Sequence, residues 1–243
     1  MRVGEHKDVQ LPVMICQDGF ITSHAIENIE LLETEKVKEF VGEYKPEEYL
    51  LKKENPMSVG PYDLPAYYIE HKRQQAQAMM NAKQVILDVA KEFGDITGRH
   101  YGLFEEYMME DAETAVVMIG SSAGTAKEAI NELRAQGKKV GLVKIRVFRP
   151  FPMKELEKAL SKVKAVAVMD KAESFSACGG PLFAETRSAL YGCATKPLMV
   201  NYVYGLGGRD VRVESIQNVF AALDKIVADG AEGEVYRYLD VRD

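Results

Sequence analysis

Short apolar runs alternate with amphipathic stretches through the second half of the chain. The apolar runs predict strands at residues 114–120, 139–148, 165–170 and 197–205. The amphipathic stretches that follow them predict helices at residues 124–137, 152–163, 181–192 and 213–230. Strands that are apolar enough for burial on both faces, each followed by a helix, are typical of a mostly parallel sheet with right-handed crossovers. The pattern therefore predicts an α/β domain with flanking helices over residues 114–243.

The N-terminal part follows a different pattern. Residues 9–20, VQLPVMICQDGF, predict a short apolar strand that runs into a turn at Asp18 and Gly19, and the next stretch, SHAIENIELL, has helix-start chemistry at Ser23. The backbone groups of a strand need a neighbouring strand as partner. We therefore expect residues 1–40 either to be poorly ordered in the isolated chain or to be buried in an oligomeric contact.

A proline-rich connector and a long helix separate these two parts. Residues 42–65 carry four prolines and little periodicity, which is typical of a loop that wraps a surface or a partner. After the connector, apolar residues recur at helical spacing and predict one face of a long amphipathic helix that ends near Gly94. The residues of this face are Ile69, Ala76, Met79, Ile86, Ala90 and Phe93.

Composition narrows the possible partners. The chain has 243 residues, of which 47% are hydrophobic, enough to bury a core. Its formal charge of -6 and its dispersed basic residues provide no field for nucleic acid or an anionic membrane, so we expect neither partner. No apolar run approaches the roughly 20 residues of a membrane span, and MRVGEHKDVQ lacks the apolar core of a signal peptide. The expected location is cytoplasmic.

The cysteines indicate no metal or disulfide framework. Cys16, Cys178 and Cys193 are an odd number and form no CxxC pair, so neither a zinc site nor an iron–sulfur ligand set is predicted in this chain. Cys178 stands beside a Gly-Gly pair and is either a reactive thiol or, as is commoner, a small buried cysteine.

The junction IGSSAGTAKEA is the first candidate for ligand binding. It places Ser121, Ser122 and Thr125 at a predicted helix N-terminus, where free N–H groups and the helix dipole favour an anion. The junction matches neither the GxGxxG nor the GxxxxGK[ST] fingerprint, and a turn with an N-cap serine needs the same residue types without a ligand.

Further polar residues follow the ends of the next two predicted strands. Arg149 in VFRPFP is a candidate for contact with an acidic partner, although surface arginines near strand ends are common. The stretch DKAESFSACGG brings four more polar residues to a strand end, so we expect the carboxyl edge of the sheet to be polar and rich in loops. These four residues are Asp170, Lys171, Ser174 and Ser176.

The stretch VYGLGGRDV follows the fourth predicted strand. Its glycines allow positive φ in a tight turn, and Asp210 is suited to cap the loop, so we interpret the stretch as structural rather than as a phosphate site. Arg209 is a candidate for a subunit contact. Among the histidines, His24 opens a predicted helix after a turn and is suited to face a cleft, although an exposed helix-start histidine is the commoner case.

Several of these motifs occur together, in order, in one known family. The run from TGRHYGLFEEYMMEDAETAVVMIGSSAGTAKEA to KIRVFRPFP, followed by VMDKAESFSACGGPLFAETRSAL and YVYGLGGRDV, resembles the alpha chain of the 2-oxoacid:ferredoxin oxidoreductases. The resemblance is strongest to the pyruvate-specific enzymes and covers nearly the whole chain. MICQDGFITSHAIENIELL resembles the end of the family's thiamine-diphosphate domain, and YDLPAYYIEHKRQQAQAM its connector.

The resemblance implies three regions. Residues 1–41 are expected to be a C-terminal remnant of the thiamine-diphosphate-binding domain, residues 42–113 a connector with a long amphipathic helix, and residues 114–243 a domain similar to the C-terminal domain of transketolases. We expect the chain to be the C-terminal part of a longer subunit, because the family's residues for the 2-oxoacid lie in a segment with no counterpart before Met1. No catalytic residue is therefore assigned. Asp18, Gly19, Ser23 and His24 are expected at the edge of the active site only when that segment is present.

The resemblance also implies a function. The complete complex would convert pyruvate and CoA to acetyl-CoA, CO2 and reduced ferredoxin in anaerobic metabolism, with this chain as scaffold and subunit interface and inactive by itself. Thiamine diphosphate would be bound by the complete complex rather than by this chain alone, and iron–sulfur clusters would lie on other chains. The expected partners are a thiamine-binding beta chain, a gamma chain, a ferredoxin-like delta chain and ferredoxin.

Two alternatives remain open. The first is an alpha chain for 2-oxoglutarate or a branched-chain 2-oxoacid, against which the tyrosine-rich connector GPYDLPAYYIE favours pyruvate. The second is a stand-alone module that binds a partner or an anion at residues 121–125. A self-sufficient module of that kind is expected to bind phosphate, CoA or thiamine diphosphate by itself.

Overall fold

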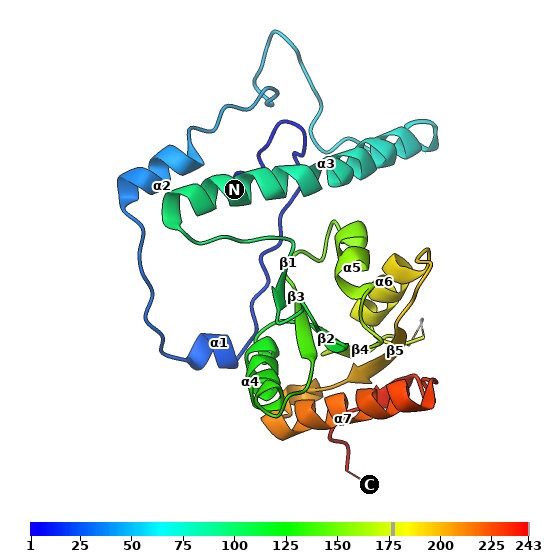
Figure 1. The fold of residues 1–243 in the computed structure, drawn as a ribbon. Coiled ribbons are helices and arrows are strands. Elements are labelled where there is room, and N and C mark those ends of the chain that lie inside the picture. The colour runs from blue at the N-terminus through cyan, green and yellow to red at the C-terminus, as the bar shows by residue number, and fades with distance from the viewer. Residues whose placement is uncertain (176–177, 243) are drawn as a thin grey trace. The chain divides into compact units, whose positions relative to one another are not determined.

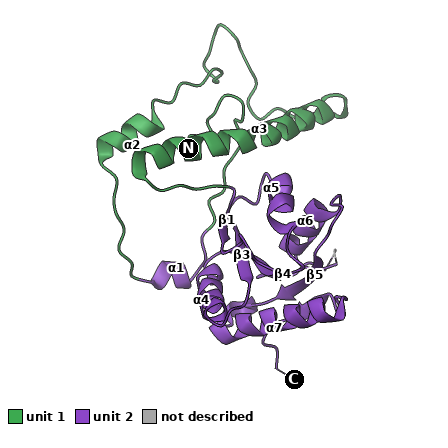
Figure 2. Cartoon of the chain, in the orientation of Figure 1, with its two compact units in different colours: residues 1–16, 26–102 green, residues 17–25, 103–243 purple. Residues whose placement is uncertain are grey.

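The structure is a computed structural model that describes residues 1–175 and 178–242. It divides into two compact units (Figure 2). The helical unit contains Met1–Cys16 and Ile26–Gly102, and the α/β unit contains Gln17–Ala25 and Leu103–Asp243. The short segment of residues 17–25 therefore belongs with a domain that begins almost 80 residues later in the sequence.

The described part of the α/β unit is built on a six-stranded sheet of order β1-β3-β2-β4-β5-β6. β1 pairs antiparallel with β3, and the other pairs are parallel. The strands are β1 (Phe104–Tyr107), β2 (Thr114–Ile119), β3 (Val140–Ile145), β4 (Ala165–Asp170), β5 (Leu198–Val203) and β6 (Tyr236–Tyr238). The predicted mostly parallel α/β sheet is confirmed.

Helices cover both faces of this sheet (Figure 1). α4 and α7 pack on one face, and α5 and α6 pack on the other. Their bounds are α4 (Ser122–Ala135), α5 (Met153–Leu160), α6 (Pro181–Leu190) and α7 (Val213–Asp229). Both ends of α4, α6 and α7 lie within two residues of the predicted bounds, and α5 ends three residues early. The hydrophobic period determines the middle of a helix better than its ends.

The alternating side chains of the central strands build a separate core on each face. In β2, Val116 and Met118 pack against α4 and α7, whereas Ala115 and Val117 pack toward α5 and α6. All four side chains are fully buried. Burial of a valine or methionine side chain of this kind contributes about 1.5–3 kcal/mol, so each core stabilises the unit.

Two strands were not predicted. β1 and β6 lie at the two edges of the sheet, and both are short. The β1 sequence FEEY places two consecutive glutamates in the strand, and β6 has only three residues, so neither shows the apolar run of a buried strand. Edge strands of this kind form because a neighbouring strand offers free hydrogen-bonding groups.

In the helical unit, α3 (Pro65–Thr97) packs against the N-terminal residues of the chain. Val9, Ala82 and Val85 form the small core of this unit. The helix ends at Gly98, whose φ of 69° forms a left-handed C-cap, and not near Gly94 as predicted.

Gly94 has a packing role inside α3 instead. A Cβ atom at this position would collide with the Nδ1 atom of His100, so the imidazole lies directly against the glycine backbone. The predicted apolar face is also only partly used. Ile69 is 70% exposed, and the buried residues of α3 lie in its second half.

Two predictions for the N-terminal part are wrong within the described residues. Residues 9–16 form no strand, and Met14 and Ile15 are 86% and 91% exposed, because no other strand pairs with this segment. The helix predicted from Ser23 is a single turn, α1 (Ile21–His24), and residues 25–33 are not helical. Ile26 and Ile29 have no apolar surface against them, and a short unpacked helix is unstable in water.

A second short helix, α2 (Thr34–Val41), follows in the helical unit. No helix in the described part of the chain combines the length and apolar character needed to cross a membrane. The division at residues 41 and 113 that the sequence suggested stays a prediction.

Candidate functional site

The carboxyl edge of the sheet, where β2, β4 and β5 end, gathers polar residues from four parts of the chain. Ser121 follows β2, Asp170 ends β4, and Tyr204 follows β5. The segment of residues 17–25 joins them through Asp18. In open parallel sheets this edge is where ligands usually bind.

Asp18 lies at the N-terminus of α4. Its Oδ2 atom accepts a hydrogen bond from the backbone N–H of Ser121 across 103 positions of sequence. Gly120, with φ of 89°, leaves room for this approach, because a Cβ there would lie 2.8 Å from Oδ2. The helix N-terminus that was a candidate for an external anion therefore holds a carboxylate of the chain itself.

The surroundings of Asp18 favour its ionised form. Burial raises its pKa, but the hydroxyl and backbone N–H of Ser121 and the charges of Lys171 and Lys144 outweigh that effect, so the pKa lies below its usual value. The stem of Lys171 packs against Gly205, where a Cβ would lie 3.2 Å from Cε. Two cations and a helix N-terminus thus face one carboxylate.

Tyr204 connects this carboxylate to the core. Its side chain is 2% exposed, its hydroxyl is hydrogen-bonded to the side chain of Ser122, and its backbone N–H donates to the carbonyl of Asp170 at 3.0 Å. Burial raises the pKa of the phenol, the Ser122 bond opposes it, and the charges of Asp18 and Asp170 add to the increase. Tyr204 therefore stays a neutral phenol at pH 7.

Asp170 and Asn201 form a buried polar network beside it. Asp170 accepts hydrogen bonds from the backbone N–H groups of Leu182 (2.8 Å) and Phe183 (3.1 Å), at the start of α6. The Nδ2 atom of Asn201 donates to Oδ2 of Asp170 at 2.9 Å, and its Oδ1 atom accepts from the N–H of Gly180 at 2.8 Å. Asp170 thus acts as the cap of α6 through its side chain.

Close packing explains the glycines in this network. A Cβ at Gly180 would lie 2.5 Å from Oδ2 of Asp170, and a Cβ at Gly179 would lie 2.9 Å from Oδ1 of Asn201. Burial raises the pKa of Asp170 above its usual value, although the N–H groups of Leu182 and the next residue oppose the effect. This network fixes the turn before α6 and is part of the fold rather than a reactive centre.

The other residues predicted for the active-site edge remain at the surface. Gly19, Ser23 and His24 are exposed. His24 stacks on Phe20 with ring centroids 4.6 Å apart, and its Nδ1 atom lies 2.8 Å from Oγ of Ser23. These contacts stay inside the segment, so the structure brings only Asp18 of this group to the carboxyl edge.

The remaining candidates make local contacts. Thr125 lies in the second turn of α4 and is half-buried. Arg149 is exposed, stacks over Phe148 at 4.4 Å, and forms an ion pair with Glu185 of α6. Ser176 lies outside the described residues. Cys178 and Cys16 are exposed, whereas Cys193 is buried.

The glycine-rich loop after β5 has a structural conformation. Gly205, Gly207 and Gly208 all have positive φ, and the loop contains the short 3-10 helix η1 (Leu206–Gly208). Arg209 donates a hydrogen bond to the backbone carbonyl of Asp240, which connects the loop to the C-terminal segment. Asp210 is exposed.

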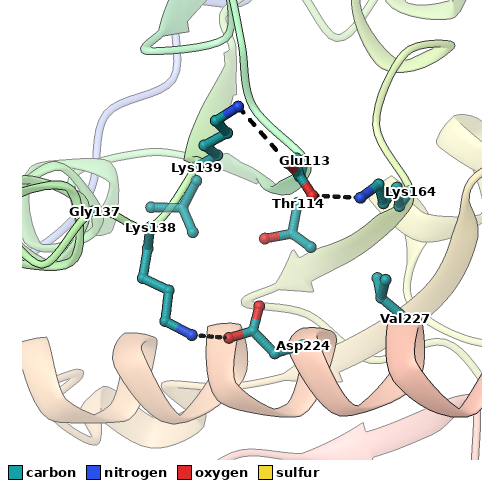
Figure 3. Close-up of a pocket in the computed structure, with 9 residues that line it drawn as sticks. Glu113, Thr114, Gly137, Lys138, Lys139, Lys164, Asp224 and Val227 are labelled. Carbon is teal, nitrogen blue, oxygen red and sulfur yellow. Dashed lines mark hydrogen bonds and ion pairs between the residues drawn. The ribbon is translucent and has the colours of Figure 1, made fainter.

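A hollow of about 430 Å³ lies at the opposite edge of the sheet, where β2, β3 and β4 begin (Figure 3). Its lysines already have partners. Lys138 pairs with Asp224 at 2.6 Å, Lys164 pairs with Glu113, and Lys139 lies 3.9 Å from the same glutamate. The charges are largely compensated at the surface, so we assign no ligand to this hollow.

A second hollow, of about 540 Å³, lies within the helical unit. Arg2 lines it, donates to the carbonyl of Phe40 at 2.8 Å and pairs with Glu92 at the same distance. These contacts hold the N-terminus of the chain against α2 and α3. Among the residues that the structure describes, no group of three His, Cys, Asp or Glu side chains is placed to hold a metal ion.

Sequence reasoning missed Tyr204 and Asn201. Both lie in PLMVNYVYG, and the signal was the asparagine, because a polar side chain inside an apolar strand must find buried partners. No sequence signal of this kind predicts the contact between Asp18 and Ser121, because neither stretch contains a local pattern that depends on the other.

Two family models match the chain in succession. Residues 1–91 match the thiamine diphosphate-binding model of pyruvate flavodoxin/ferredoxin oxidoreductase, and residues 112–216 match core domain II of pyruvate:ferredoxin oxidoreductase. The second match lies within the α/β unit. The chain belongs to the family of 2-oxoacid:ferredoxin oxidoreductase alpha subunits.

Curated relatives in this family are similar along almost all of the chain. It is 48% identical over 245 residues to pyruvate synthase subunit PorA of Thermotoga maritima, covering 100% of this chain and 61% of that protein. It is 39% identical to PorA of Methanocaldococcus jannaschii, covering 94% and 58%. Ketoisovalerate oxidoreductase subunit VorA of Pyrococcus abyssi is 41% identical, covering 91% and 56%. The chain thus spans about three fifths of the length of these relatives.

Proposed function

We propose that this chain is the alpha-subunit region of a pyruvate synthase. The observation that carries the proposal is the 48% identity to a PorA subunit over the whole chain, together with two family models in the expected order. The complete complex would convert pyruvate and CoA to acetyl-CoA and CO2, releasing one proton and passing two electrons to ferredoxin.

The chain contributes structure rather than the whole active site. Its carboxyl-edge residues are engaged with one another, as Asp18 with Ser121 and Asp170 with Asn201. Residues 1–41, 42–113 and 114–243 are proposed as the end of the thiamine domain, a connector and a transketolase-like domain. Gly19, Ser23 and His24, exposed here, would form the edge of the active site once other residues complete it.

Thiamine diphosphate would be held by the complete complex rather than by this chain alone. The backbone N–H of Ser121 at the start of α4, where a diphosphate could bind, already donates to the carboxylate of Asp18. When bound in the complex, the cofactor would supply the chemistry that cleaves the carboxylate from the 2-oxoacid. The iron–sulfur clusters would lie on other subunits, in a cytoplasmic complex with gamma, beta and delta chains.

Reconstitution tests this function. The chain, completed by the other subunits, is expected to reduce ferredoxin with pyruvate and CoA, while the isolated metal-free chain shows no pyruvate-dependent dye reduction. Turnover by the isolated chain, or a reconstituted complex that is inactive with every 2-oxoacid, would overturn the proposal. Binding of phosphate or CoA to the isolated chain would instead favour a stand-alone module.

A second candidate substrate is a branched-chain 2-oxoacid. The 41% identity to a ketoisovalerate oxidoreductase subunit favours it almost as well as the 39% identity to one of the pyruvate relatives. The reconstituted complex should be compared on pyruvate, 2-oxoglutarate and 3-methyl-2-oxobutanoate under the same conditions. If kcat/KM for 2-oxoglutarate or for 3-methyl-2-oxobutanoate is higher than that for pyruvate, that 2-oxoacid is the preferred substrate and pyruvate is not.

A further inference from the structure

We propose that Asp18 is a tethered anion that positions residues 17–25 on the carboxyl edge of the sheet. The sequence suggested an anion site at residues 121–125 and, separately, an active-site edge at residues 18–24. The structure brings the two together, because the carboxylate of the second occupies the N-terminus offered by the first. The placement of residues 17–25 by Asp18 does not depend on the proposed function. The expected effect of Asp18 on turnover rests on the proposed function.

The carboxylate of Asp18 lies directly against the backbone of Gly120. A Cβ at Gly120 would lie 2.8 Å from Oδ2 and 3.0 Å from Oδ1 of Asp18, so both oxygens lie against the glycine backbone. Oδ2 accepts the N–H of Ser121, which is one of the N–H groups that a helix cannot satisfy internally.

The electrostatic environment suits a permanent negative charge. α4 has 14 residues, and its N-terminus carries the positive end of the helix dipole. Lys171 and Lys144 act on the same carboxylate from the ends of two strands. A tethered carboxylate thus satisfies a site that would otherwise attract an anion from solution.

The remainder of the segment has few other attachments in the described structure. The hydrogen bonds of Ser23 and His24 stay within residues 20–24. Phe20 is 71% exposed and Ile21 is 53% exposed, so apolar burial does not fix the segment either. We therefore infer that Asp18 determines where Ser23 and His24 are presented.

Amide hydrogen exchange on the full chain tests the tether. In Asp18→Asn and Asp18→Ala, exchange at Ser121 and over residues 17–25 is expected to be about tenfold faster, the effect of losing a helix-capping carboxylate. Exchange in β2 and β4 should be unchanged. Glu128→Gln, which removes an exposed carboxylate from α4 itself, is the matched control and should behave as wild type. Unchanged exchange over residues 17–25 in the folded Asp18 variants would overturn the proposal.

Added acetate separates the anion from the tether. In Asp18→Ala, acetate is expected to restore protection at Ser121 but not over residues 17–25, because a free anion satisfies the helix without holding the segment. Asp18→Glu should restore part of the protection at both places. If acetate also restores residues 17–25, or fails to protect Ser121, the tethered-anion assignment is wrong.

Turnover of the assembled complex tests the positioning role. Asp18→Asn is expected to lower kcat/KM for the 2-oxoacid by about tenfold, as small misplacements of active-site elements do. Asp18→Glu should recover part of this loss, and Glu128→Gln should show none of it. Faster amide exchange in the Asp18 variants with unchanged turnover would overturn the positioning role. The attachment of residues 17–25 through Asp18 would then still stand. A wild-type complex without turnover would count against the proposed function alone, since the exchange results would still decide the tether.

Discussion

Asn201 connects three buried polar groups of the α/β unit. It is fully buried in β5 and bonds to the carbonyl of Val168, to the carboxylate of Asp170 and to the N–H of Gly180. Each partner is itself removed from water, so the amide is costly to replace. The same amide fixes the turn that begins α6.

Replacing Asn201 with alanine is expected to destabilise the protein by about 2–4 kcal/mol, because three buried groups lose their partner at once. The free energy of unfolding from urea titration measures the effect. Asn218→Ala, an exposed position on α7, is the control and should change stability by no more than about 0.5 kcal/mol. Equal effects of the two substitutions would show that the network adds nothing to stability.

Acid should weaken the fold in part through Asp18. Its pKa in the folded chain is below the ordinary value of 3.8, so its contribution is fully present above that pH and is lost as the pH falls through the folded pKa. Asp18→Asn should therefore be less stable than wild type at pH 6, with a difference that shrinks toward pH 3. Urea titrations across this range measure it, and a difference independent of pH would contradict the assignment.

Asp170 is expected to act with the opposite sign. Burial raises its folded pKa, so the folded chain binds a proton more readily than the unfolded chain just above pH 3.8, and stability falls as the pH rises through the raised value. The two aspartates thus act against each other in the acid limb. The Asp18 variant isolates one contribution because it leaves the Asp170 network intact.

At the scale of elements, two helical glycines have opposite surroundings. A Cβ at Gly124 in α4 would meet nothing within 4 Å, whereas a Cβ at Gly94 in α3 would collide with the ring of His100. Gly124→Ala is expected to stabilise by about 0.5–1 kcal/mol through helix propensity. Gly94→Ala should lose this gain, because His100 must leave its position.

Thermal unfolding of the two alanine variants and of Gly94→Ala combined with His100→Ala tests this contrast. The double variant should recover the stability lost in the single variant, because the clash no longer exists. Equal stabilisation by both single substitutions would mean that His100 moves away without cost.

The pairing of edge strand β1 indicates where a truncated α/β unit should begin. Phe104 and Tyr107 pair with Ile145 and Leu142 of β3, so a piece that begins at residue 114 exposes an edge of the sheet that the chain otherwise covers. We expect residues 103–243 to unfold cooperatively and residues 114–243 to be less stable and more prone to associate. Calorimetry and sedimentation compare them, and equal behaviour of the two pieces would show that β1 is dispensable.

The elements of the α/β unit could be predicted because their signal is local. Buried strands such as AVAVMD are continuous apolar runs, and the helices between them keep a helical period. The prediction of an N-terminal strand was wrong because a strand also needs a partner, which no local signal provides. Val13 and Ile15 are residue types typical of strands, but no strand lies beside them and both are exposed. The candidate site was predicted only as separate pieces, because the bond between Asp18 and Ser121 spans 103 positions and depends on the completed fold.

At the scale of the whole molecule, we expect the exposed apolar side chains of Ile26, Ile29 and Leu31 in the helical unit to be covered in an assembled complex. Ile26 and Ile29 are 101% and 77% exposed, and Leu31 is 85% exposed. Soluble proteins rarely leave such a concentration of large apolar side chains in water unless it is a contact surface. This exposure supports the proposal that the chain functions with other subunits.

Replacing Ile26 and Ile29 together with glutamate should therefore weaken assembly without unfolding the chain. Neither side chain is packed in the described structure, so thermal unfolding should be unchanged, whereas two buried charges in a subunit contact would oppose association. Glu27→Gln combined with Asn28→Ala changes exposed polar positions between them and is the control. Sedimentation of each chain mixed with the other subunits measures assembly. Assembly of the diglutamate chain with wild-type affinity would place the contact surface elsewhere. Loss of assembly in the control as well would show that the polar side chains between the two isoleucines, and not the apolar side chains alone, make the contact.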